Sequence, residues 1–565
     1  MTEGRNGRHW FEGWILGGLF GLALLLRGWA LGLRPPTPLE AAQAWAAWRG
    51  EPLAPGGSPF LAGWNATAFA LFGADDGWMR SGAALAGALT VIALWMLLRP
   101  IGLAAAVGAA WLWAVSPTSL MASRFLDGGI VAAAALAAAL AAWRALHPSR
   151  WVRVAAALGI GAAAGPAFWT GCLMLLPLLW LDPPEPSFPR WRALGLFGLT
   201  ALLAGAWGGW RGSGARETVE GLSAWLAGFA PEGLPLWWSA VPTFLRAETP
   251  IFLLGLTGGI LAASRGDRFP LAMMIGAGIG LGLRLVRWSA PFTEHPVVLL
   301  PWVVLGAYAL QRVWEAVRSQ WHGRWVEVAG AAALGWIGLG TAAVWMASSS
   351  VMGEAGWLVL AGVLGLLGLG AWALGSSLET GSEVSPSESS GSTPVHPHGT
   401  SIGSILQAWA RNPAALGIGL SVILSIGLAQ IAGAVALIQR TDPVPGFSQP
   451  AMASPAVREV VAVLREEAVR RKEWPGGLSV AVSGEPEIFW RWILREFQVR
   501  IYRRPLAAGM GGEVEEDVWI TPEGLEVPLK PEQWVGRPFP AIIEGTGVAR
   551  PVEQRMVLWM RIHVP

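Results

Sequence analysis

Glu40 is the carboxylate whose position most favours chemistry. It lies in the segment RPPTPLEAAQAWAAWRGEPLAP, directly after the first long apolar stretch. Ala44, Trp45 and Trp48 follow it at helical spacing, which predicts a short helix at a membrane surface. A carboxylate at that depth would meet the phosphate headgroup of a lipid and could act as a general base. An ordinary solvated loop acid is the alternative, and spacing alone does not decide between the two.

Arg124 and Asp127 form a second candidate pair, in the segment SPTSLMASRFLDGG. An arginine can engage a phosphate, and an aspartate can bind a sugar hydroxyl or a metal ion. The alternative is an ion pair at a helix junction. We expect this pair to face the same compartment as Glu40, and joint action requires all three side chains to surround one cavity.

Further ionisable residues stand near the ends of later apolar runs. Glu248 lies in FLRAETPIF, and Glu294 and His295 lie in SAPFTEHPVVLLPW, close after Arg284 and Arg287. Charged groups at membrane depth are costly, so they favour a functional interpretation. At an interface, however, long side chains can reach water, which weakens that argument.

The composition places these residues in a membrane protein. Of the 565 residues, 53% are hydrophobic and only 14% are charged, a balance that soluble chains of this size do not have. The arginines are scattered between apolar runs rather than gathered in one patch, which argues against nucleic-acid binding. Cys172 is the only cysteine, so a disulfide framework or a thiolate metal site within one chain is excluded.

Apolar runs long enough to cross a bilayer recur along the chain, and we predict an α-helical polytopic membrane protein with about thirteen transmembrane helices. The runs between 151 and 181 are short and interrupted by proline, so they form either two spans or one span and a re-entrant segment. The predicted spans cover residues 12–33, 79–98, 101–117, 128–146, 151–167, 169–181, 192–210, 249–263, 269–285, 295–311, 326–347, 356–375 and 414–438.

The arginines between the spans predict the orientation. With the N-terminus in the cytoplasm, the arginine-rich connections fall on one side, as the positive-inside rule requires. The first span lacks a small-residue cleavage site and is expected to remain as an anchor. This topology leaves five segments outside the cytoplasm: 34–77, 118–127, 211–248, 284–295 and everything after 439.

The domain organisation follows from changes in composition. Residues 377–413 are rich in Ser, Gly and Pro and predict a disordered linker; His396 and His398 within it are only a weak metal signal. Beyond Arg440, a helical pattern at 454–472 and a strand pattern at 478–484 predict a small α/β domain. The expected parts are a transmembrane domain (1–376) with its first outer loop (34–77), a cytoplasmic linker (377–413), a last transmembrane helix (414–438) and an extracytoplasmic domain (440–565).

Several of these segments, in order, resemble the GT-C superfamily of membrane glycosyltransferases. TPLEAAQAWAAWRG is similar to an acidic first-loop motif, SPFLAGWNATAFALFG to the elements that follow it, and SRFLDGG to a Ser-Arg-Phe motif with an acid. The likeness continues through LSAWLAGFAPEGLPLWWSAVPTFLRAETP, SAPFTEHPVVLLPW and FWRWILREF, and so covers most of the chain. The branch that it resembles most is the Agl23-like flippase-activity-associated family, which is related to the protein mannosyltransferases.

This resemblance implies inverting transfer of a sugar from a polyprenyl-phosphate donor to a glycan, lipid or protein acceptor outside the cytoplasm of a bacterial or archaeal cell. It makes Glu40 the catalytic base, and Arg124 and Asp127 the site of the donor phosphate or a metal ion. Participation of a divalent metal ion is left open. The resemblance assigns supporting roles to Glu248, Arg284, Arg287, Glu294 and His295.

The chain departs from this family in the first-loop motif, at GPAFW (165–169), where the family has Lys-Glu, and at Glu294-His295, where it has Glu-Lys. Relatives carry Asp-Glu in the first-loop motif, whereas this sequence has Leu39-Glu40. The alternatives are therefore a catalytically degenerate relative that binds a glycolipid or acts as a scaffold, and a transporter or flippase component for lipid-linked sugars. A transporter usually places charges near the midplane of several spans, and Arg27 is the main residue of that kind here.

Overall fold

The chain is described by a computed structural model. The described residues are 3–54, 56–145, 147, 149–183, 189–229, 248–287, 294–315, 318, 452–471, 474–483, 486–502, 516–523, 534–544 and 552–561. The predicted spans 326–347, 356–375 and 414–438 and the predicted linker 377–413, with His396 and His398, lie outside these residues.

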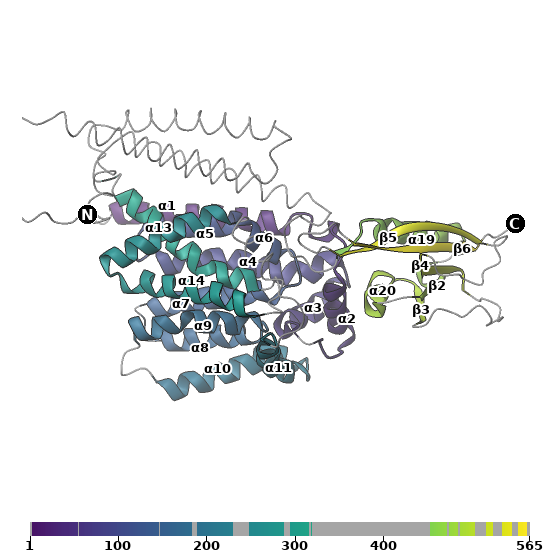
Figure 1. Cartoon of the computed structure of the whole chain (residues 1–565), viewed down its shortest axis with the longest axis horizontal. Helices are drawn as coiled ribbons and strands as arrows, with labels where there is room; N and C mark the ends of the chain where they lie inside the picture. Colours follow the sequence, from purple (N-terminus) through teal and green to yellow (C-terminus); the bar gives the residue numbers. More distant parts are fainter. Residues whose placement is uncertain are drawn as a thin grey trace, which may run out of the picture.

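Helices dominate the first part of the chain and form a bundle (Figure 1). A further helix, His295–Glu315, follows them without a label. The labelled elements are α1 (Glu3–Gly28), η1 (Leu31–Leu33), α2 (Pro38–Arg49), α3 (Pro59–Phe72), α4 (Asp76–Leu98), α5 (Leu103–Val115), α6 (Pro117–Ser123), α7 (Gly128–Arg144), α8 (Arg150–Ala162), α9 (Ala167–Leu181), α10 (Arg190–Gly205), η2 (Trp207–Gly209), α11 (Gly214–Ala227), α13 (Thr249–Arg265) and α14 (Arg268–Val286).

The predicted spans can be compared with these helices. Each span that falls on described residues coincides with a helix over most of its length. By length and apolar composition, four described helices can cross a membrane: Trp10–Leu33, Asp76–Leu98, Arg268–Val286 and His295–Glu315; α5 and α6 together would make a fifth. Apolar helices α7, α9 and α13 are shorter. The chain is thus a multi-pass membrane protein, while the predicted number of thirteen spans is not confirmed.

The third predicted span, 101–117, coincides with α5, and the chain bends directly after that helix. Helices α5 and α6 meet at Ser116 at an angle of 59°. Arg27 of α1 is fully buried at this break and donates hydrogen bonds to the carbonyl oxygens of Trp113 (3.0 Å) and Ala114 (3.1 Å). Carbonyl groups in the last turn of a helix have no hydrogen-bond donor within that helix. Arg27, the exception noted in the sequence, therefore caps a broken helix inside the bundle.

A glycine makes room for this cap. The Nε of Arg27 donates to the Oγ of Ser123 (3.0 Å), and both groups lie against Gly87 of α4. A Cβ added at Gly87 would lie 2.1 Å from that Oγ and 2.8 Å from the Nε. Small residues at such contacts let membrane helices approach closely. The break in α5–α6 thus depends on α1 and α4 together.

The last part of the chain forms a mixed six-stranded sheet with the order β1-β5-β6-β4-β2-β3. Strand β2 pairs in parallel with β3 and β4, and the other pairings are antiparallel. Leu464, Val480, Phe489 and Ile520 are fully buried in its core. The elements are β1 (Met452–Ala453), α19 (Ala456–Arg470), η5 (Pro475–Gly477), β2 (Ser479–Ser483), α20 (Glu487–Ile493), β3 (Gln498–Tyr502), β4 (Val518–Pro522), β5 (Trp534–Glu544) and β6 (Val552–Arg561).

This sheet domain sits at one end of the helical bundle, beyond α2 and α3 (Figure 1). Trp492 of α20 packs edge-on against Trp48 of α2, with ring centroids 6.4 Å apart, and also contacts Phe69 of α3. A mostly helical membrane protein with a small C-terminal sheet is thereby confirmed. The exact domain boundaries and the side of the membrane stay predictions.

Replacing Gly87 by alanine tests the cap on the broken helix. We expect Gly87→Ala to lower the free energy of unfolding by about 1–3 kcal/mol, because the methyl group displaces Ser123 and Arg27. Thermal unfolding in detergent measures the loss. Gly21→Ala is the control, since a Cβ there meets nothing within 4 Å. Equal stability of the two variants would contradict the role of Gly87.

Candidate functional site

Glu40 lies at the start of α2, where local sequence sets its position. The hydroxyl of Thr37 accepts from the backbone N–H of Glu40 (3.1 Å), and the Glu40 carboxylate accepts from the N–H of Thr37 (2.8 Å). This reciprocal pair is a capping box, which fixes the first turn of a helix. Pro38 at the first helical position suits the same turn. The predicted short helix after the first apolar stretch is confirmed.

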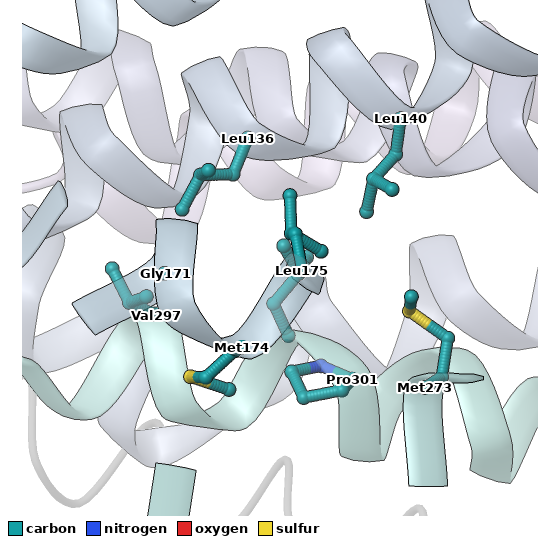
Figure 2. Close-up of a pocket in the computed structure, with 9 residues that line it drawn as sticks. Leu136, Leu140, Gly171, Met174, Leu175, Met273, Val297 and Pro301 are labelled. Atoms are coloured by element: carbon teal, nitrogen blue, oxygen red, sulfur yellow. The ribbon is translucent and has the colours of Figure 1, made fainter. Parts of the chain in front are cut away.

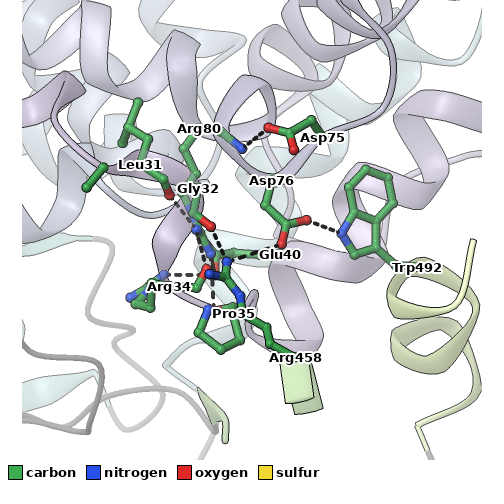
Figure 3. Close-up of polar contacts among 12 residues, drawn as sticks. Leu31, Gly32, Arg34, Pro35, Glu40, Asp75, Asp76, Arg80, Arg458 and Trp492 are labelled. Carbon is green, nitrogen blue, oxygen red and sulfur yellow. Dashed lines mark hydrogen bonds and ion pairs between the residues drawn. The ribbon is translucent and has the colours of Figure 1, made fainter. Parts of the chain in front are cut away.

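Two arginines hold the Glu40 side chain (Figure 3). The Nη2 of Arg34 lies 2.9 Å from one carboxylate oxygen, and Arg80 donates from Nε (2.9 Å) and Nη2 (3.1 Å). The backbone N–H of Leu126 donates a further bond of 3.0 Å. With the bond from Thr37, the carboxylate accepts five hydrogen bonds. We call Arg34, Glu40 and Arg80 the first-loop cluster.

Arg80 binds more than the carboxylate. It is fully buried in the first turns of α4 and donates from Nη1 to the carbonyl oxygens of Leu31 (2.9 Å) and Arg34 (2.8 Å). Its Nη2 also reaches the carbonyl oxygen of Pro35 at 3.3 Å. The chain between α1 and α2 is therefore wrapped around one arginine side chain. The sequence did not single out Arg80, because it reads as a charge at the beginning of an apolar run.

The first-loop cluster keeps Glu40 ionised. Burial alone raises the pKa of this carboxyl, but the charges and hydrogen bonds of Arg80 and Arg34 outweigh burial and lower its pKa to about 2. A general base works best when its pKa lies near the working pH. In this arrangement Glu40 is a firmly held anion, and its predicted role as a base would require it to leave donors that it now binds.

Arg124 does not pair with Asp127. Its guanidinium donates to carbonyl oxygens at the end of α1, with the shortest bond to Trp29 (2.6 Å) and others to Leu26 and Ala30 (both 3.3 Å). Arg124 therefore caps the first helix, as cations near a helix C-terminus often do. The Nε of Arg124 takes no part in these contacts. Its predicted binding of a donor phosphate stays a prediction.

Asp127 lies directly beside the first-loop cluster. It is the N-cap of α7, and its Oδ1 accepts from the N–H of Gly129 (2.8 Å). Its Oδ2 accepts no hydrogen bond from the described residues, although only 3% of the residue is exposed. Burial, and then the negative charge of Glu40, raise the pKa of Asp127 to about 7. Glu40 and Asp127 thus form a neighbouring pair of carboxyls with opposite pKa shifts.

Glu248 is placed near the same end of the bundle. It is fully buried, and its Oε1 accepts from the Ser116 hydroxyl and the Thr118 N–H, both at 2.7 Å. Glu248 therefore binds the break between α5 and α6, which leads into the loop of Arg124 and Asp127. Its predicted supporting role stays a prediction.

The remaining predicted residues gather on another pair of helices. Arg287, just after α14, forms a buried ion pair with Glu294, and Arg284 lies 2.7 Å from the Nε2 of His295. The Arg287 guanidinium also donates to the carbonyl oxygen of Trp225 (3.1 Å). These side chains join the end of α14 to α11 and to the start of the helix His295–Glu315.

One residue that the sequence did not predict connects the sheet domain to this site. Asp76, the first residue of α4, accepts from the Nε1 of Trp492 (3.0 Å) and lies 3.7 Å from Arg458 (Figure 3). It also lies 3.6 Å from Arg495. Arg458 also donates to the carbonyl oxygen of Gly32. The only signal in the sequence was the aromatic and Arg-rich segment FWRWILREF, which contains two of these partners.

A metal site is not assembled from the described residues, where no three His, Cys, Asp or Glu side chains are close enough to hold an ion. Glu40 and Asp127 are a pair of carboxyls only.

A small apolar pocket lies deeper in the bundle, between α7, α9, α14 and the helix His295–Glu315 (Figure 2). Its wall is made of hydrocarbon and thioether groups, including those of Leu136, Leu140, Met174 and Met273. Gly171 of α9 brings the helices together here, since a Cβ on it would lie 2.1 Å from Leu136. The free space is about 10 Å³, close to that of one water molecule, so this pocket is a packing gap between helices.

The helical bundle, the loop site at its end and the adjoining sheet define a membrane protein with the GT-C fold. The chain is similar to ArnT from Cupriavidus metallidurans, a GT-C glycosyltransferase, in its apo state (TM-score 0.52) and bound to undecaprenyl phosphate (TM-score 0.53). Each comparison covers 97% of this chain and 98% of ArnT at 16% identity. No protein family and no curated protein matches the sequence. This likeness shows an ArnT-like fold and does not support the Agl23-like branch.

Replacing Glu40 by glutamine tests whether the first-loop cluster is a structural ion pair. Loss of the anion leaves the fully buried Arg80 and the partly buried Arg34 without their counter-charge, so we expect about 3–5 kcal/mol of lost stability, measured by thermal unfolding. Glu220→Gln is the control, because Glu220 pairs with Arg216 on the exposed face of α11. If both variants unfold at the same temperature, the cluster does not stabilise the fold.

Asp76→Asn tests the attachment of the sheet domain. The neutral amide loses the attraction of Arg458 and Arg495, so we expect faster proteolytic separation of the sheet domain from an intact bundle. Limited proteolysis followed by mass spectrometry measures the rate. Glu496→Gln, which removes an exposed pair with Arg465, should cleave like the wild type. Equal rates for Asp76→Asn and wild type would mean that the aromatic contacts suffice.

Proposed function

We propose that this chain is a membrane glycosyltransferase that moves a sugar from a polyprenyl-phosphate donor to an acceptor outside the cytoplasm. The observation that carries the proposal is the likeness to ArnT bound to undecaprenyl phosphate, which extends over almost the whole of both chains. A fold alone hosts many functions. The site at the end of the bundle therefore has to support the same conclusion.

The site supports it by joining two distant segments, the start of α2 with Glu40 and the loop that carries Arg124 and Asp127. Glu40 accepts from the N–H of Leu126, which places it next to Asp127, and Arg124 closes the same loop against the end of α1. The GT-C resemblance assigns these three residues to the reaction centre. Carboxylates beside cations at the end of a membrane bundle suit a reaction between a phosphate-linked sugar and a hydroxyl.

The chemistry of the proposal is a single displacement. The acceptor hydroxyl attacks the anomeric carbon, a carboxylate takes its proton, and polyprenyl phosphate leaves as an anion with the bonding electrons. Cations near the leaving phosphate stabilise its growing charge. The donor's apolar tail remains in the hydrocarbon core of the bilayer.

The finer assignment rests on the sequence. The order of its motifs favours the Agl23-like branch of the superfamily. The resemblance also favours a bacterial or archaeal inner membrane. The arginines between the spans favour an N-terminus in the cytoplasm and a sheet domain outside. The sheet domain, attached through Asp76, would then cover the acceptor side of the site.

A second candidate, a glycolipid-binding relative without activity, is favoured by Leu39. This residue occupies the position where the resemblance expects an aspartate, and its side chain is 44% exposed beside Glu40. A carboxylate at position 39 would be exposed at the surface of the loop, whereas the Glu40 carboxylate is buried. If that aspartate is essential, the chain binds its lipid but does not react.

Transfer of label from the lipid-linked donor separates these candidates. Purified protein in lipid vesicles is incubated with radiolabelled polyprenyl-phosphate sugars and extracted envelope lipids, and the products are separated by chromatography. We expect time-dependent transfer, and none from nucleotide sugars, because the proposed donor is membrane-bound. Protein-free vesicles are the control.

The other outcomes each favour a different function. Binding of the labelled donor without transfer would favour the glycolipid-binding relative or scaffold. Movement of a fluorescent lipid-linked sugar between the leaflets, without a new product, would favour a transporter or flippase component. Absence of both donor binding and sugar transfer would overturn the proposal.

A further inference from the structure

We infer that Asp127, rather than Glu40, accepts the proton of the attacking hydroxyl. This inference rests on the proposed function and assigns one step within the same site. It starts from the different hydrogen bonding of two neighbouring carboxyls.

Glu40 has no oxygen left for a substrate hydroxyl. Its Oε1 accepts from Arg80 and Leu126, and its Oε2 accepts from Arg34, Arg80 and Thr37. Three of these five bonds come from guanidinium groups, which bind a carboxylate about twice as strongly as neutral donors do. A hydroxyl could approach only if part of the first-loop cluster came apart.

Only one carboxylate oxygen of Asp127 accepts a hydrogen bond from the described residues. Its Oδ1 caps α7 through Gly129, and its Oδ2 has no donor among the described residues despite its burial. A buried polar atom without a partner is rare and costly in native structures. An O–H donor from a substrate would satisfy it and would at the same time be positioned to lose its proton.

The position of this carboxyl is fixed by packing. A Cβ on the next residue, Gly128, would lie 1.9 Å from the carbonyl oxygen of Ala164 and 3.0 Å from Ser58. On the other side, Arg34 stacks on the Phe125 ring at 3.3 Å. The loop is therefore clamped between the starts of α2 and α3 and the connection of α8 to α9. A catalytic group held this closely is preorganised.

The neighbouring charges act differently on Glu40 and on Asp127. Arg34 and Arg80 face Glu40 and hold it ionised, while Arg124 faces the end of α1. Burial and the charge of Glu40 then raise the pKa of Asp127 to about 7, against an ordinary value of 3.8. Two carboxyls with pKa values pushed apart are a common arrangement in acid–base sites.

The hydroxyl proton passes to Oδ2 of Asp127 while the hydroxyl oxygen bonds to the anomeric carbon. The bond from that carbon to the phosphate oxygen breaks, and its electron pair leaves with polyprenyl phosphate. Asp127 afterwards gives the proton to water.

Asp127→Asn tests this assignment without removing the helix cap, because asparagine is as good an N-cap residue as aspartate. We expect at least about a 100-fold loss of kcat/KM, since a positioned base contributes about 10²–10⁴-fold. The matched control is Asp75→Asn, because Asp75 caps α4 through Gly77 in the same way but is exposed. It should transfer at the wild-type rate.

The pH profile gives a readout that a structural role would not change. If Asp127 is the base, kcat/KM of the wild type rises with pH to a midpoint of about 7 and levels off above it. If Glu40 is the base, the rate is flat above about pH 4, because its pKa is lowered to about 2. The residual activity of Asp127→Asn should lack the limb near neutral pH.

A third measurement does not depend on turnover. The infrared band of protonated carboxyls should titrate near pH 7 in the wild type and in Asp75→Asn. In Asp127→Asn this band should be smaller but still present, because burial also raises the pKa of Glu248 to about 7. Stability gives the folding check. Between about pH 4 and 7 the folded Asp127 keeps a proton that the unfolded chain releases, so stability falls as pH rises. Above pH 7, Asp127→Asn should unfold no earlier than the wild type.

The outcomes distinguish this inference from the proposed function. Wild-type transfer together with equal transfer by Asp127→Asn, or a wild-type profile without a limb near pH 7, would overturn the role of Asp127 and leave the function standing. Absence of transfer by the wild type from every polyprenyl-phosphate sugar would remove both.

Discussion

The buried pair of Arg80 and Glu40 organises one end of this molecule. An ion pair is stable inside a protein only when both charges keep a full set of hydrogen bonds, and removing one partner leaves a costly isolated charge. Here Arg80 gathers the carbonyl groups between Leu31 and Pro35, and Glu40 binds the N–H of Leu126. Four segments, namely the connection after α1, α2, α4 and the loop before α7, therefore meet at this pair.

The sheet domain is attached to the same helix that carries Arg80. Asp76 and Arg80 are four residues apart, so they lie on one face of the first turns of α4. Asp76 accepts a hydrogen bond from Trp492 and lies close to Arg458 and Arg495 of the sheet domain. Arg80 binds the connection between α1 and α2. A displacement of the sheet domain would consequently reach the first-loop cluster through about one turn of helix. The first turns of α4 therefore hold both the sheet domain and the first-loop cluster.

Local features of this site could be predicted from the sequence, but pairing between distant segments could not. The capping box around Thr37 and Glu40 and the helices under the apolar runs depend on neighbouring residues, so spacing reveals them. The partner of Glu40, in contrast, is 40 residues away, and Arg124 binds α1 rather than the aspartate three residues on. Neither sequence spacing nor residue type records which donors the folded chain brings to a carboxylate.

The five hydrogen bonds to Glu40 make the absence of an aspartate at position 39 more important. A carboxylate that accepts five hydrogen bonds is valuable as an anchor and poor as a base, so loss of its acidic neighbour would abolish the proposed chemistry if no other carboxyl were free. Asp127 is such a carboxyl, and the negative charge of Glu40 is one of the reasons why it can take up a proton near neutral pH. The firmly bound anion would then contribute to the transfer indirectly, by tuning its neighbour.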